Sequence, residues 1–355
     1  MDRSESDWKS RDRSPGWDGR AIPDGRNPLA RVDVWLPVRD GAATLPRAVE
    51  SIRRQTFRDW RLILVDDGST DATPEIAARL EERDDRIRVI RQPALGLVAA
   101  LRTAAARSDA PFAARMDADD VAHPPRLETQ IASGGDIRAA RVRGSHAGEG
   151  MRRYIRWNNA LTTHDAMANA LFIESPLVHP TAFFSRVSYE RAGGYRDPGW
   201  AEDYDLWLRA WAAGMTFAKV PKVLLTWSDR PHRLTRTHAA YSEKALRRAK
   251  LEYLPRHPLL AAGPLTVWGA GPIGRGWIRD LRAKGFEVEQ AIDIDPRKIG
   301  RRIANEVPVR DPEEALGRRG GPVLGAVGSR GARALIRRRL NRAGLIEGSD
   351  FLFLA

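Results

Sequence analysis

The sequence contains no cysteine, which excludes disulfide bonds, thiol catalysis and cysteine-ligated zinc. It also has no apolar run approaching the roughly 18 residues that a membrane-spanning helix requires. The first residues lack the apolar core of a secretion signal. These absences predict a cytoplasmic protein, either soluble or in peripheral contact with the inner face of the membrane.

Length and charge set the outer limits on what the chain can be. At 355 residues it exceeds one typical domain, so two domains are expected. A net charge of +13 and a pI near 10.6 favour an anionic partner such as a nucleotide, a lipid surface or nucleic acid. Most basic residues are arginines interleaved with Asp and Glu in an Ala-rich chain, so genomic composition explains the excess equally well.

Apolar periodicity divides the first part of the chain into a tail and an alternating α/β region. Residues 1–28 show no periodicity and predict a disordered tail. From residue 32 onward, strands alternate with helices, which indicates a mostly parallel sheet. The expected strands are 32–38, 60–65, 87–90 and 111–116, and the expected helices are 44–55, 71–82 and 96–107.

Two acidic residues, Asp117 and Asp119, directly follow the fourth of these strands. On extended backbone, residues separated by one position point the same way. Two such carboxylates form a hard oxygen site for Mg²⁺ or Mn²⁺, whose remaining ligands are water and phosphate oxygens. An isolated Asp-x-Asp is more simply an acidic loop. Its place at the carboxyl end of a strand makes this one a candidate metal site.

Three polar turns fall at the same predicted edge of the sheet, at residues 37–40, 66–69 and 117–120. Each alone reads as an ordinary turn. Together they lie where a doubly wound sheet binds nucleotides, in the crevice beyond the carboxyl ends of its strands.

The order and spacing of five segments resemble the family 2 glycosyltransferases of GT-A fold. The segments are Val34-Trp35-Leu36-Pro37-Val38, Val65-Asp66-Asp67-Gly68-Ser69-Thr70-Asp71, Arg115-Met116-Asp117-Ala118-Asp119-Asp120, Gly193-Gly194-Tyr195 and Ala201-Glu202-Asp203-Tyr204-Asp205-Leu206-Trp207. The resemblance covers most of residues 29–240 and implies a doubly wound mixed sheet of GT-A type.

The resemblance also implies roles for single residues. The nucleoside of a sugar donor would be held by Pro37, Val38, Asp40 and Asp66, the metal-bound diphosphate by Asp117 and Asp119, and the acceptor proton by Asp203 as catalytic base. The chain departs from the usual pattern at Arg39–Asp40, where a pair such as Tyr-Asn is common. Residues 130–144 also look short and Gly-rich for the helix and strand that usually follow the metal motif.

Several residues further along are candidates for the acceptor or the phosphates. His179 and Glu202 flank the catalytic motif, and Arg233 lies in a basic segment, 222–238, that is too irregular for a helix and is placed like a lid. Between Gly150 and Leu161, an aromatic stripe with a basic rim indicates core packing; an acceptor platform or a lipid-facing edge is the alternative.

The α/β pattern restarts at Gly263, after a basic helical linker over 241–262. A strand, a G-x-G-x-x-G turn and a helix follow, with an acidic residue about 20 positions on, as in a Rossmann nucleotide site. The site residues would be Gly269, Gly271, Gly274 and Asp293. Residues 263–355 are therefore expected to form a smaller Rossmann-like α/β domain, whose nucleotide site is either functional or vestigial.

The leading hypothesis is a metal-dependent inverting glycosyltransferase that uses a nucleoside diphosphate sugar and a glycan or lipid-linked acceptor. Its expected role is cell-surface polysaccharide synthesis. A nicotinamide-dependent sugar-nucleotide oxidoreductase would explain only the Gly-rich turn. A nucleotidyltransferase would share the Asp-x-Asp site but release pyrophosphate. Nucleic-acid binding is not expected, because the predicted crevice is acidic.

Overall fold

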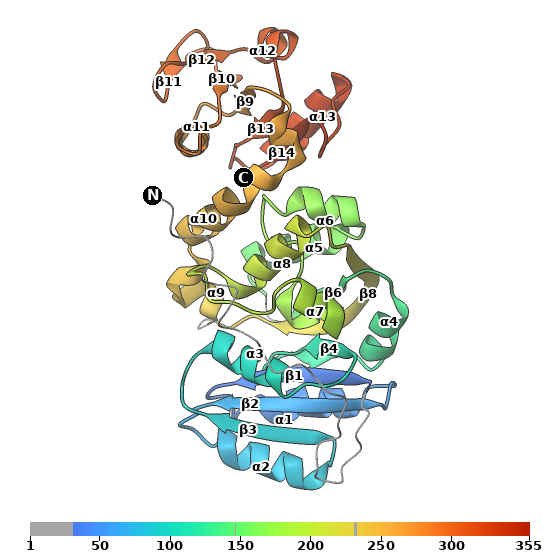
Figure 1. The fold of residues 1–355 in the computed structure, drawn as a ribbon. Helices are drawn as coiled ribbons and strands as arrows, with labels where there is room; N and C mark the ends of the chain where they lie inside the picture. The colour runs from blue at the N-terminus through green and yellow to red at the C-terminus, as the bar shows by residue number, and fades with distance from the viewer. Residues whose placement is uncertain (1–30, 146, 231–232) are drawn as a thin grey trace, which may run out of the picture.

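The computed structural model describes residues 31–145, 147–230 and 233–355. The predicted tail, residues 1–28, lies outside this part of the chain. An eight-stranded mixed sheet has the order β3-β2-β1-β4-β7-β6-β8-β5 (Figure 1). Its strands are β1 (Val32–Val38), β2 (Trp60–Asp67), β3 (Ile87–Gln92), β4 (Phe112–Arg115), β5 (Val121–Ala122), β6 (Ile137–Ser145), β7 (Phe183–Ser185) and β8 (Phe217–Ser228). The pairs from β3 to β4 are parallel, whereas β7 and β5 run antiparallel to their neighbours.

Helices cover both faces of this sheet, and the alternation along β1 shows how. Val34 and Leu36 pack in one apolar cluster with residues of α1, whereas Trp35 packs in another with residues of α3. Successive strand side chains point to opposite faces, so a strand between two helical layers must be apolar on both. The helices of this part are α1 (Leu45–Arg53), α2 (Thr73–Arg83), α3 (Leu97–Ala106), α4 (Arg126–Ala132), α5 (Glu149–Ala160), α6 (His164–Ala170), α7 (Arg186–Arg191) and α8 (Glu202–Ala212), with the 3₁₀ turn η1 (His179–Thr181).

Two residues of β1 look out of place in a buried strand. Pro37 does not break the strand, because it falls beyond the Trp35–Arg115 pair that ends the pairing with β4. Asp33 is fully buried, but its carboxylate accepts a bidentate contact from Arg61 at 2.9 and 2.8 Å and a hydrogen bond from Ser108 Oγ at 2.7 Å. A buried charge satisfied in this way is tolerated in a core.

Two sequence-based expectations in this part are wrong. Residues 130–144 do contain a helix end and a full strand, because α4 and β6 are joined by a tight turn in which Gly135 adopts φ +93°. A Cβ there would lie 2.8 Å from Ala218 Cβ, so only glycine fits. The segment 222–238 is also more regular than expected: β8 continues to Ser228 past a register shift near Pro221, and a short helix, α9 (Leu234–Thr237), follows.

A second, smaller sheet of six strands has the order β11-β12-β10-β9-β13-β14 and is parallel except for β11. Its strands are β9 (Leu265–Trp268), β10 (Val288–Ile292), β11 (Arg302–Ile303), β12 (Val307–Arg310), β13 (Val323–Gly325) and β14 (Phe351–Phe353), and its helices are α11 (Pro272–Ala283), α12 (Pro312–Arg318) and α13 (Ala332–Arg342). The mixed sheet followed by a smaller α/β sheet confirms the expected fold class.

The segment between the sheets is mostly helical. It comprises η2 (Ala239–Tyr241), α10 (Glu243–Tyr253), η3 (Leu254–Arg256) and η4 (Pro258–Ala261). From α10, Lys250 Nζ donates to the carbonyls of Ile173 at 2.7 Å and Leu354 at 3.2 Å, so this helix contacts residues that adjoin both sheets. Within the described ranges, no helix has both the length and the apolar character needed to cross a bilayer.

Candidate active site

The carboxyl ends of β1, β2 and β4 meet at one edge of the large sheet, because these strands are neighbours and parallel. A crevice of about 1250 Å³ opens beyond this edge. Its walls come from the turns after these strands, from α5 and α8, and from the segment after β8. Residues that line it include Pro37, Val38, Asp40, Asp67, Arg115, Asp117, Asp119, Tyr154, Glu174, His179, Glu202, Asp203, Trp227, Arg230, Arg233 and Tyr241.

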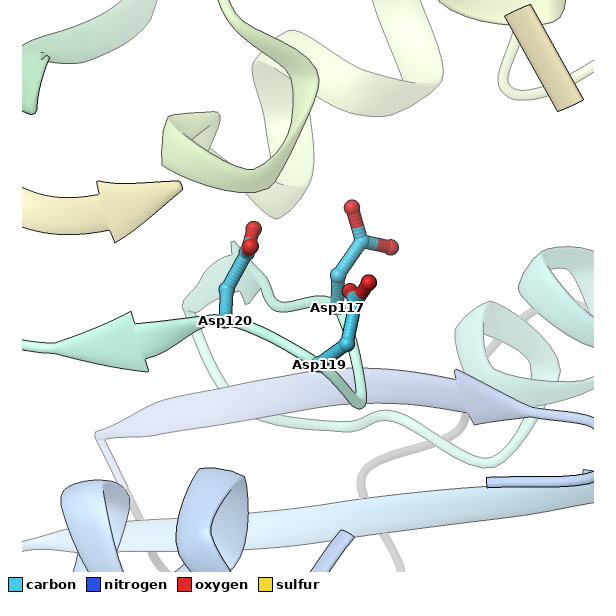
Figure 2. A group of neighbouring side chains, drawn as sticks. All are labelled: Asp117, Asp119 and Asp120. Carbon is cyan, nitrogen blue, oxygen red and sulfur yellow. The ribbon is translucent and has the colours of Figure 1, made fainter. Parts of the chain in front are cut away.

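Three carboxylates converge after β4. Oxygen atoms of Asp117, Asp119 and Asp120 all lie within 4.8 Å of one another (Figure 2). Asp120 is fully buried; its Oδ1 accepts the Ser228 N–H at 2.8 Å, whereas its Oδ2 has no hydrogen-bond partner among the described residues. Burial and the neighbouring carboxylates raise the pKa of Asp119 and raise the pKa of Asp120 well above its usual value.

Sequence reasoning identified Asp117 and Asp119 but missed Asp120. On extended backbone, Asp120 would point away from Asp119. The chain instead turns here, since the Asp120 N–H donates to the Asp117 carbonyl at 3.3 Å. This turn brings the third carboxylate to the same side as the other two, and the Pro-rich segment that follows the motif was the available signal for it.

Two arginines already stand beside this acidic group. Arg115 is buried and forms an ion pair with Asp117. Burial opposes its charge, but the Asp117 carboxylate prevails and raises the pKa of Arg115. Arg230, in the segment after β8, places its Nε 3.4 Å from Asp119 Oδ2. The net charge around the three carboxylates is therefore smaller than their number implies.

Asp203 lies at the start of α8 and faces the crevice. Its Oδ1 accepts the N–H of Tyr204 at 2.7 Å, and its other oxygen makes no hydrogen bond within the described ranges. Burial raises the pKa of Asp203 to about 6, further helped by the charge of Glu202 and opposed by His179. A partly exposed carboxylate with this pKa is suited to accept a proton near neutral pH.

Glu202, by contrast, is held by the protein itself. Its Oε2 accepts the hydroxyl of Tyr241 at 2.6 Å, and its Oε1 lies 3.4 Å from His179 Nδ1. Burial opposes the ionised form, but these two partners lower the pKa of Glu202. The second ring nitrogen of His179 is 2.7 Å from the Tyr195 hydroxyl. Both nitrogens of His179 are thus occupied, and neither is free for a phosphate or a metal.

Asp205, the third acid of α8, packs into the protein. It is fully buried and accepts hydrogen bonds from Arg209 Nε at 2.7 Å and Trp200 Nε1 at 3.1 Å. The acidic cluster in the sequence therefore separates into three environments, of which only that of Asp203 leaves a carboxylate oxygen unpaired.

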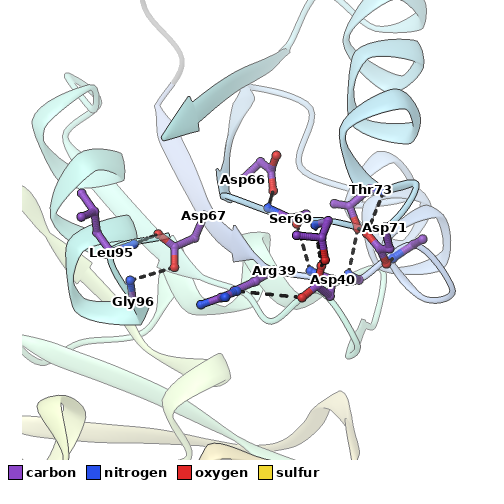
Figure 3. Close-up of polar contacts among 12 residues, drawn as sticks. Arg39, Asp40, Asp66, Asp67, Ser69, Asp71, Thr73, Leu95 and Gly96 are labelled. Carbon is purple, nitrogen blue, oxygen red and sulfur yellow. Dashed lines mark hydrogen bonds and ion pairs between the residues drawn. The ribbon is translucent and has the colours of Figure 1, made fainter. Parts of the chain in front are cut away.

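The turns after β1 and β2 are tied together by their own side chains (Figure 3). Asp40 has φ +49° and its carboxylate accepts the Thr70 N–H at 2.7 Å. This hydrogen bond lowers the pKa of Asp40. Asp67 accepts the N–H groups of Leu95 at 2.9 Å and Gly96 at 2.8 Å, which fixes the start of α3.

Of the four residues predicted to hold the nucleoside, Pro37, Val38 and Asp40 line the crevice and Asp66 does not; the neighbouring Asp67 lines it instead. Asp66 is buried, its Oδ1 accepts the Ser69 N–H at 3.0 Å, and its Oδ2 lies 3.5 Å from Arg91 Nε without a hydrogen bond. The three residues of the first turn that were predicted to hold the nucleoside thus lie together at the crevice, whereas Asp66 is buried beneath its surface.

The segment after β8 closes one side of the crevice with arginines. The guanidinium of Arg233 lies over the Trp227 ring, 4.1 Å from its centre, and its Nη1 is 3.9 Å from Asp229. Arg236 donates to the same Asp229 at 2.6 Å. Asp229 therefore orients this basic segment toward the crevice.

The Gly-rich turn joins β9 to α11, and its last glycine is closely packed. A Cβ on Gly274 would lie 1.7 Å from the Gly269 carbonyl oxygen, which explains the glycine by close packing. Gly271 caps α11. The carboxylate of Asp293 accepts the N–H of Ala270 at 3.0 Å and contacts Lys298 Nζ at 3.0 Å. Its predicted ribose-binding oxygen atoms are thus engaged by the protein.

Comparisons with known proteins show which family the chain is similar to. A sequence model of the family described as Glycosyl transferase family 2 matches residues 33–193. EpsE of Bacillus subtilis (strain 168), a glycosyltransferase by name, is 32% identical over 196 residues, which cover 52% of this chain and 68% of that protein. The amylovoran biosynthesis glycosyltransferase AmsE of Erwinia amylovora is 29% identical over 189 residues, covering 51% and 69%.

A solved structure of TarS from S. aureus is similar in fold, with a TM-score of 0.50 at 15% sequence identity over 64% of this chain and 72% of that chain. The fold is of GT-A type. The chain belongs to glycosyltransferase family 2.

Proposed function

We propose that this protein is a metal-dependent, inverting glycosyltransferase that moves a sugar from a nucleoside diphosphate to a hydroxyl of a glycan or lipid-linked acceptor. The observation that carries the proposal is the convergence of two kinds of acid in one crevice. The carboxylates of Asp117 and Asp119 line its sheet side with the buried carboxylate of Asp120 beside them, and the unpaired oxygen of Asp203 faces it from α8.

The three clustered carboxylates fit a hard divalent cation. They offer oxygen donors only, and the buried Oδ2 of Asp120 has no hydrogen-bond partner in the described chain. Asp117, Asp119 and Asp120 would hold Mg²⁺ or Mn²⁺, which supplies positive charge to the departing diphosphate. Arg230 lies close enough to this group to add to the same charge balance.

The donor would lie along the edge of the large sheet. Pro37 and Val38 form the wall nearest to β1, where a nucleoside can pack, and Asp40 fixes the shape of this wall through Thr70. Arg233 faces the crevice from the basic segment and would bind a diphosphate oxygen. Asp66 supports the wall from behind rather than by contact in this conformation.

Asp203 would act as the base. The acceptor hydroxyl transfers its proton to the free oxygen of Asp203 while its own oxygen bonds to the anomeric carbon, and the bond to the diphosphate breaks on the opposite face. This displacement inverts the configuration at the anomeric carbon. The proton ends on Asp203 and the electron pair on the nucleoside diphosphate, so the step balances without a further reagent.

Glu202 is a poor alternative base, because its two oxygens are already paired with Tyr241 and His179. We assign it the positioning role. It holds the first turn of α8 and, through its charge, contributes to the raised pKa of Asp203.

The name of the relative AmsE refers to the biosynthesis of a polysaccharide, amylovoran, which supports a role in cell-surface polysaccharide synthesis. Such a role is compatible with the predicted cytoplasmic location at the inner face of the membrane. No observation on the second sheet favours an oxidoreductase, since Asp293 is engaged by Ala270 and Lys298.

A donor screen with the purified protein tests the proposal. Nucleoside diphosphate sugars are incubated with Mn²⁺ or Mg²⁺, and the released nucleoside diphosphate is measured with and without a chelator. We expect slow, metal-dependent hydrolysis of one donor even without an acceptor. Release of pyrophosphate would instead identify a nucleotidyltransferase, and the absence of any turnover or donor binding would contradict the proposal.

A further inference from the structure

One wall of the crevice is the loop that joins α6 to η1. We call residues 171–178 the wall loop; the members that line the crevice are Glu174, Ser175, Leu177 and Val178. The next residue is His179, whose Nδ1 lies 3.4 Å from Oε1 of Glu202, the neighbour of Asp203. The position of the wall loop therefore affects both the shape of the crevice and the surroundings of the proposed base.

Side chains of other elements hold the wall loop by its backbone carbonyl groups. The donors come from α5, β8 and α10, and the bonds are Tyr154 Oη to Ser175 at 2.8 Å, Lys219 Nζ to Pro176 at 2.8 Å and Lys250 Nζ to Ile173 at 2.7 Å. Because the loop lies between elements and belongs to no strand or helix, the position of its backbone depends on such donors.

Lys250 also reaches the small sheet. Its Nζ donates to the carbonyl of Leu354, directly after β14, at 3.2 Å. Burial lowers the pKa of Lys250 to about 8, so the ammonium form predominates at neutral pH. The side chain makes no ion pair within the described ranges, and its two carbonyl partners belong to the wall loop and to the end of the small sheet.

The wall loop packs against the small sheet through a side chain as well. Ile173 belongs to an apolar cluster whose other buried members, in the described part of the chain, all lie between residues 268 and 353. Close by, Asn169 Nδ2 near the end of α6 donates to the carbonyl of Glu347 at 3.4 Å. The small sheet and its surroundings thus contact both the loop that forms a crevice wall and the helix before it.

We infer that the small sheet supports the wall loop, and that Lys250 is a positioning residue through which the end of β14 maintains the shape of the crevice. Hydrogen bonds from a charged donor are stronger than neutral ones, so one ammonium group can hold two segments together. The small sheet would then act on the crevice without binding a nucleotide of its own. Its effect on turnover rests on the proposed function, whereas its effect on the loop does not.

The test uses the full chain and compares Lys250→Met with Lys250→Arg. Methionine keeps an unbranched apolar stem but cannot donate, whereas arginine keeps the charge and the donors. The matched control is Lys244→Met, at an exposed position of the same helix. Ile173→Ala removes the side-chain contact with the small sheet and leaves Lys250 in place, so it provides the measurement if Lys250→Met does not fold.

Hydrogen–deuterium exchange with mass spectrometry measures the wall loop directly. Lys250→Met should speed amide exchange in residues 171–178 by about tenfold or more, the scale of a lost hydrogen bond to a charged group, while peptides of β1 and β2 exchange as in the wild type. Ile173→Ala should act in the same direction. Lys250→Arg should change this exchange by less than about threefold, and Lys244→Met should leave it unchanged.

Turnover is measured as metal-dependent hydrolysis of the donor found by the screen. Because the wall loop leads to His179 and Glu202 rather than to the carboxylate cluster after β4, Lys250→Met should lower kcat by about fivefold and change donor affinity by less than about twofold. Lys250→Arg should restore most of kcat. A lysine that only stabilised the fold would lower the melting temperature without separating kcat from donor affinity.

Two results would overturn the inference. One is exchange in residues 171–178 that stays unchanged, or rises evenly over the whole chain, in Lys250→Met or in the variant that replaces it. The other is faster exchange in the loop with an unchanged kcat, because Lys250 would then position nothing that catalysis needs. If the wild type turns over no donor, the proposed function fails, and the exchange measurement still decides whether the small sheet supports the wall loop.

Discussion

The two sheets of this protein end in similar turns but treat their acids in opposite ways. At the edge of the large sheet, burial raises the pKa values of Asp119, Asp120 and Asp203, and Asp120 and Asp203 each keep an oxygen without a partner in the described chain. At the edge of the small sheet, burial acts on Asp293 in the same direction, but the Asp295 N–H and Lys298 prevail and lower its pKa. The protein's own groups satisfy the charge of Asp293, whereas Asp120 and Asp203 beside the crevice are satisfied only in part.

Two cavities of the protein also differ between the large and the small sheet. The 1250 Å³ crevice lies over the acids of the large sheet. A second cavity, of about 450 Å³, is lined by residues such as Arg319, Gly320 and Asp350 and lies away from the Gly-rich turn. A strand, a Gly-rich turn and a helix therefore predict only the local backbone conformation. Whether a ligand binds there depends on the side chains around the turn that have no partner within the protein.

The comparison is tested most strongly by Asp119→Asn. Removing one of the three clustered charges should abolish metal-dependent donor binding and lower turnover by about 10³-fold or more. Isothermal titration with Mn²⁺, and then with the donor in the presence of Mn²⁺, measures both effects. Asp85→Asn, on the exposed surface, is the matched control. Unchanged Mn²⁺ affinity in Asp119→Asn would mean that these carboxylates are not the metal site.

Asp203→Asn should have the next largest effect and a different pattern. Because the side chain contacts only the acceptor proton in the proposed mechanism, donor and metal affinity should stay near wild type while kcat falls by about 10²-fold or more. Steady-state kinetics together with donor titration separate the two quantities.

The neighbouring acids of α8 are the controls for this assignment. Glu202→Gln should be less severe, because its oxygens are paired with Tyr241 and His179. Asp205→Asn should cost about 3 kcal/mol of stability by leaving Arg209 buried without its partner charge. Wild-type turnover in Asp203→Asn combined with an inactive Glu202→Gln would move the base to Glu202.

Local pattern predicted most of the large sheet's edge. The strand 32–38 has the predicted bounds, and the predicted helices of this region differ by only a few residues, because apolar periodicity is a local signal. The convergence of Asp120 was not predictable in this way, since it depends on the turn that joins its N–H to Asp117. The pairing of Asp293 with Lys298 depends likewise on how the chain folds back after β10.

Long-range contacts also explain the other misses. The sequence placed Asp66 at the donor, whereas in the structure it is buried and its Oδ2 lies beside Arg91 of the neighbouring strand β3. The sequence did not decide whether His179 is a structural residue or a site residue. In the structure its ring nitrogens contact Tyr195 and Glu202, which are 16 and 23 positions away in the chain. Such contacts are decided by tertiary packing and leave no periodic trace in the sequence.

The pH dependence of catalysis sharpens the contrast in pKa. Since the pKa of Asp203 is raised to about 6, kcat/KM should be level above this pH and fall about tenfold per unit below it, where the base is protonated. Protonation of the carboxylates that are proposed to bind the metal would also lower kcat/KM at acid pH. Donor affinity is therefore measured at each pH, so that this contribution can be separated from that of Asp203. The residual activity of Asp203→Asn should lack this limb. A limb that persists there would assign the ionisation to another group.

The smallest expected effect belongs to the small sheet and is the test that can break the comparison. Asp293→Asn keeps the size of the side chain but removes the charge that faces Lys298. The pKa of Asp293 is lower in the folded protein than in the unfolded chain. Its ionised carboxylate therefore stabilises the fold at pH values above the unfolded pKa, and this stabilisation is lost as the pH falls through the folded pKa. Because Lys298 is well exposed, the stability lost in Asp293→Asn at neutral pH should be only about 1 kcal/mol and should vanish in acid.

Urea unfolding measures this loss of stability. Transferase activity should change less than about twofold, since Asp293 lies outside the crevice. If NAD or a nucleoside diphosphate instead stabilises the wild type and not Asp293→Asn, the carboxylate is available to a ligand, and the small sheet carries a second nucleotide site after all.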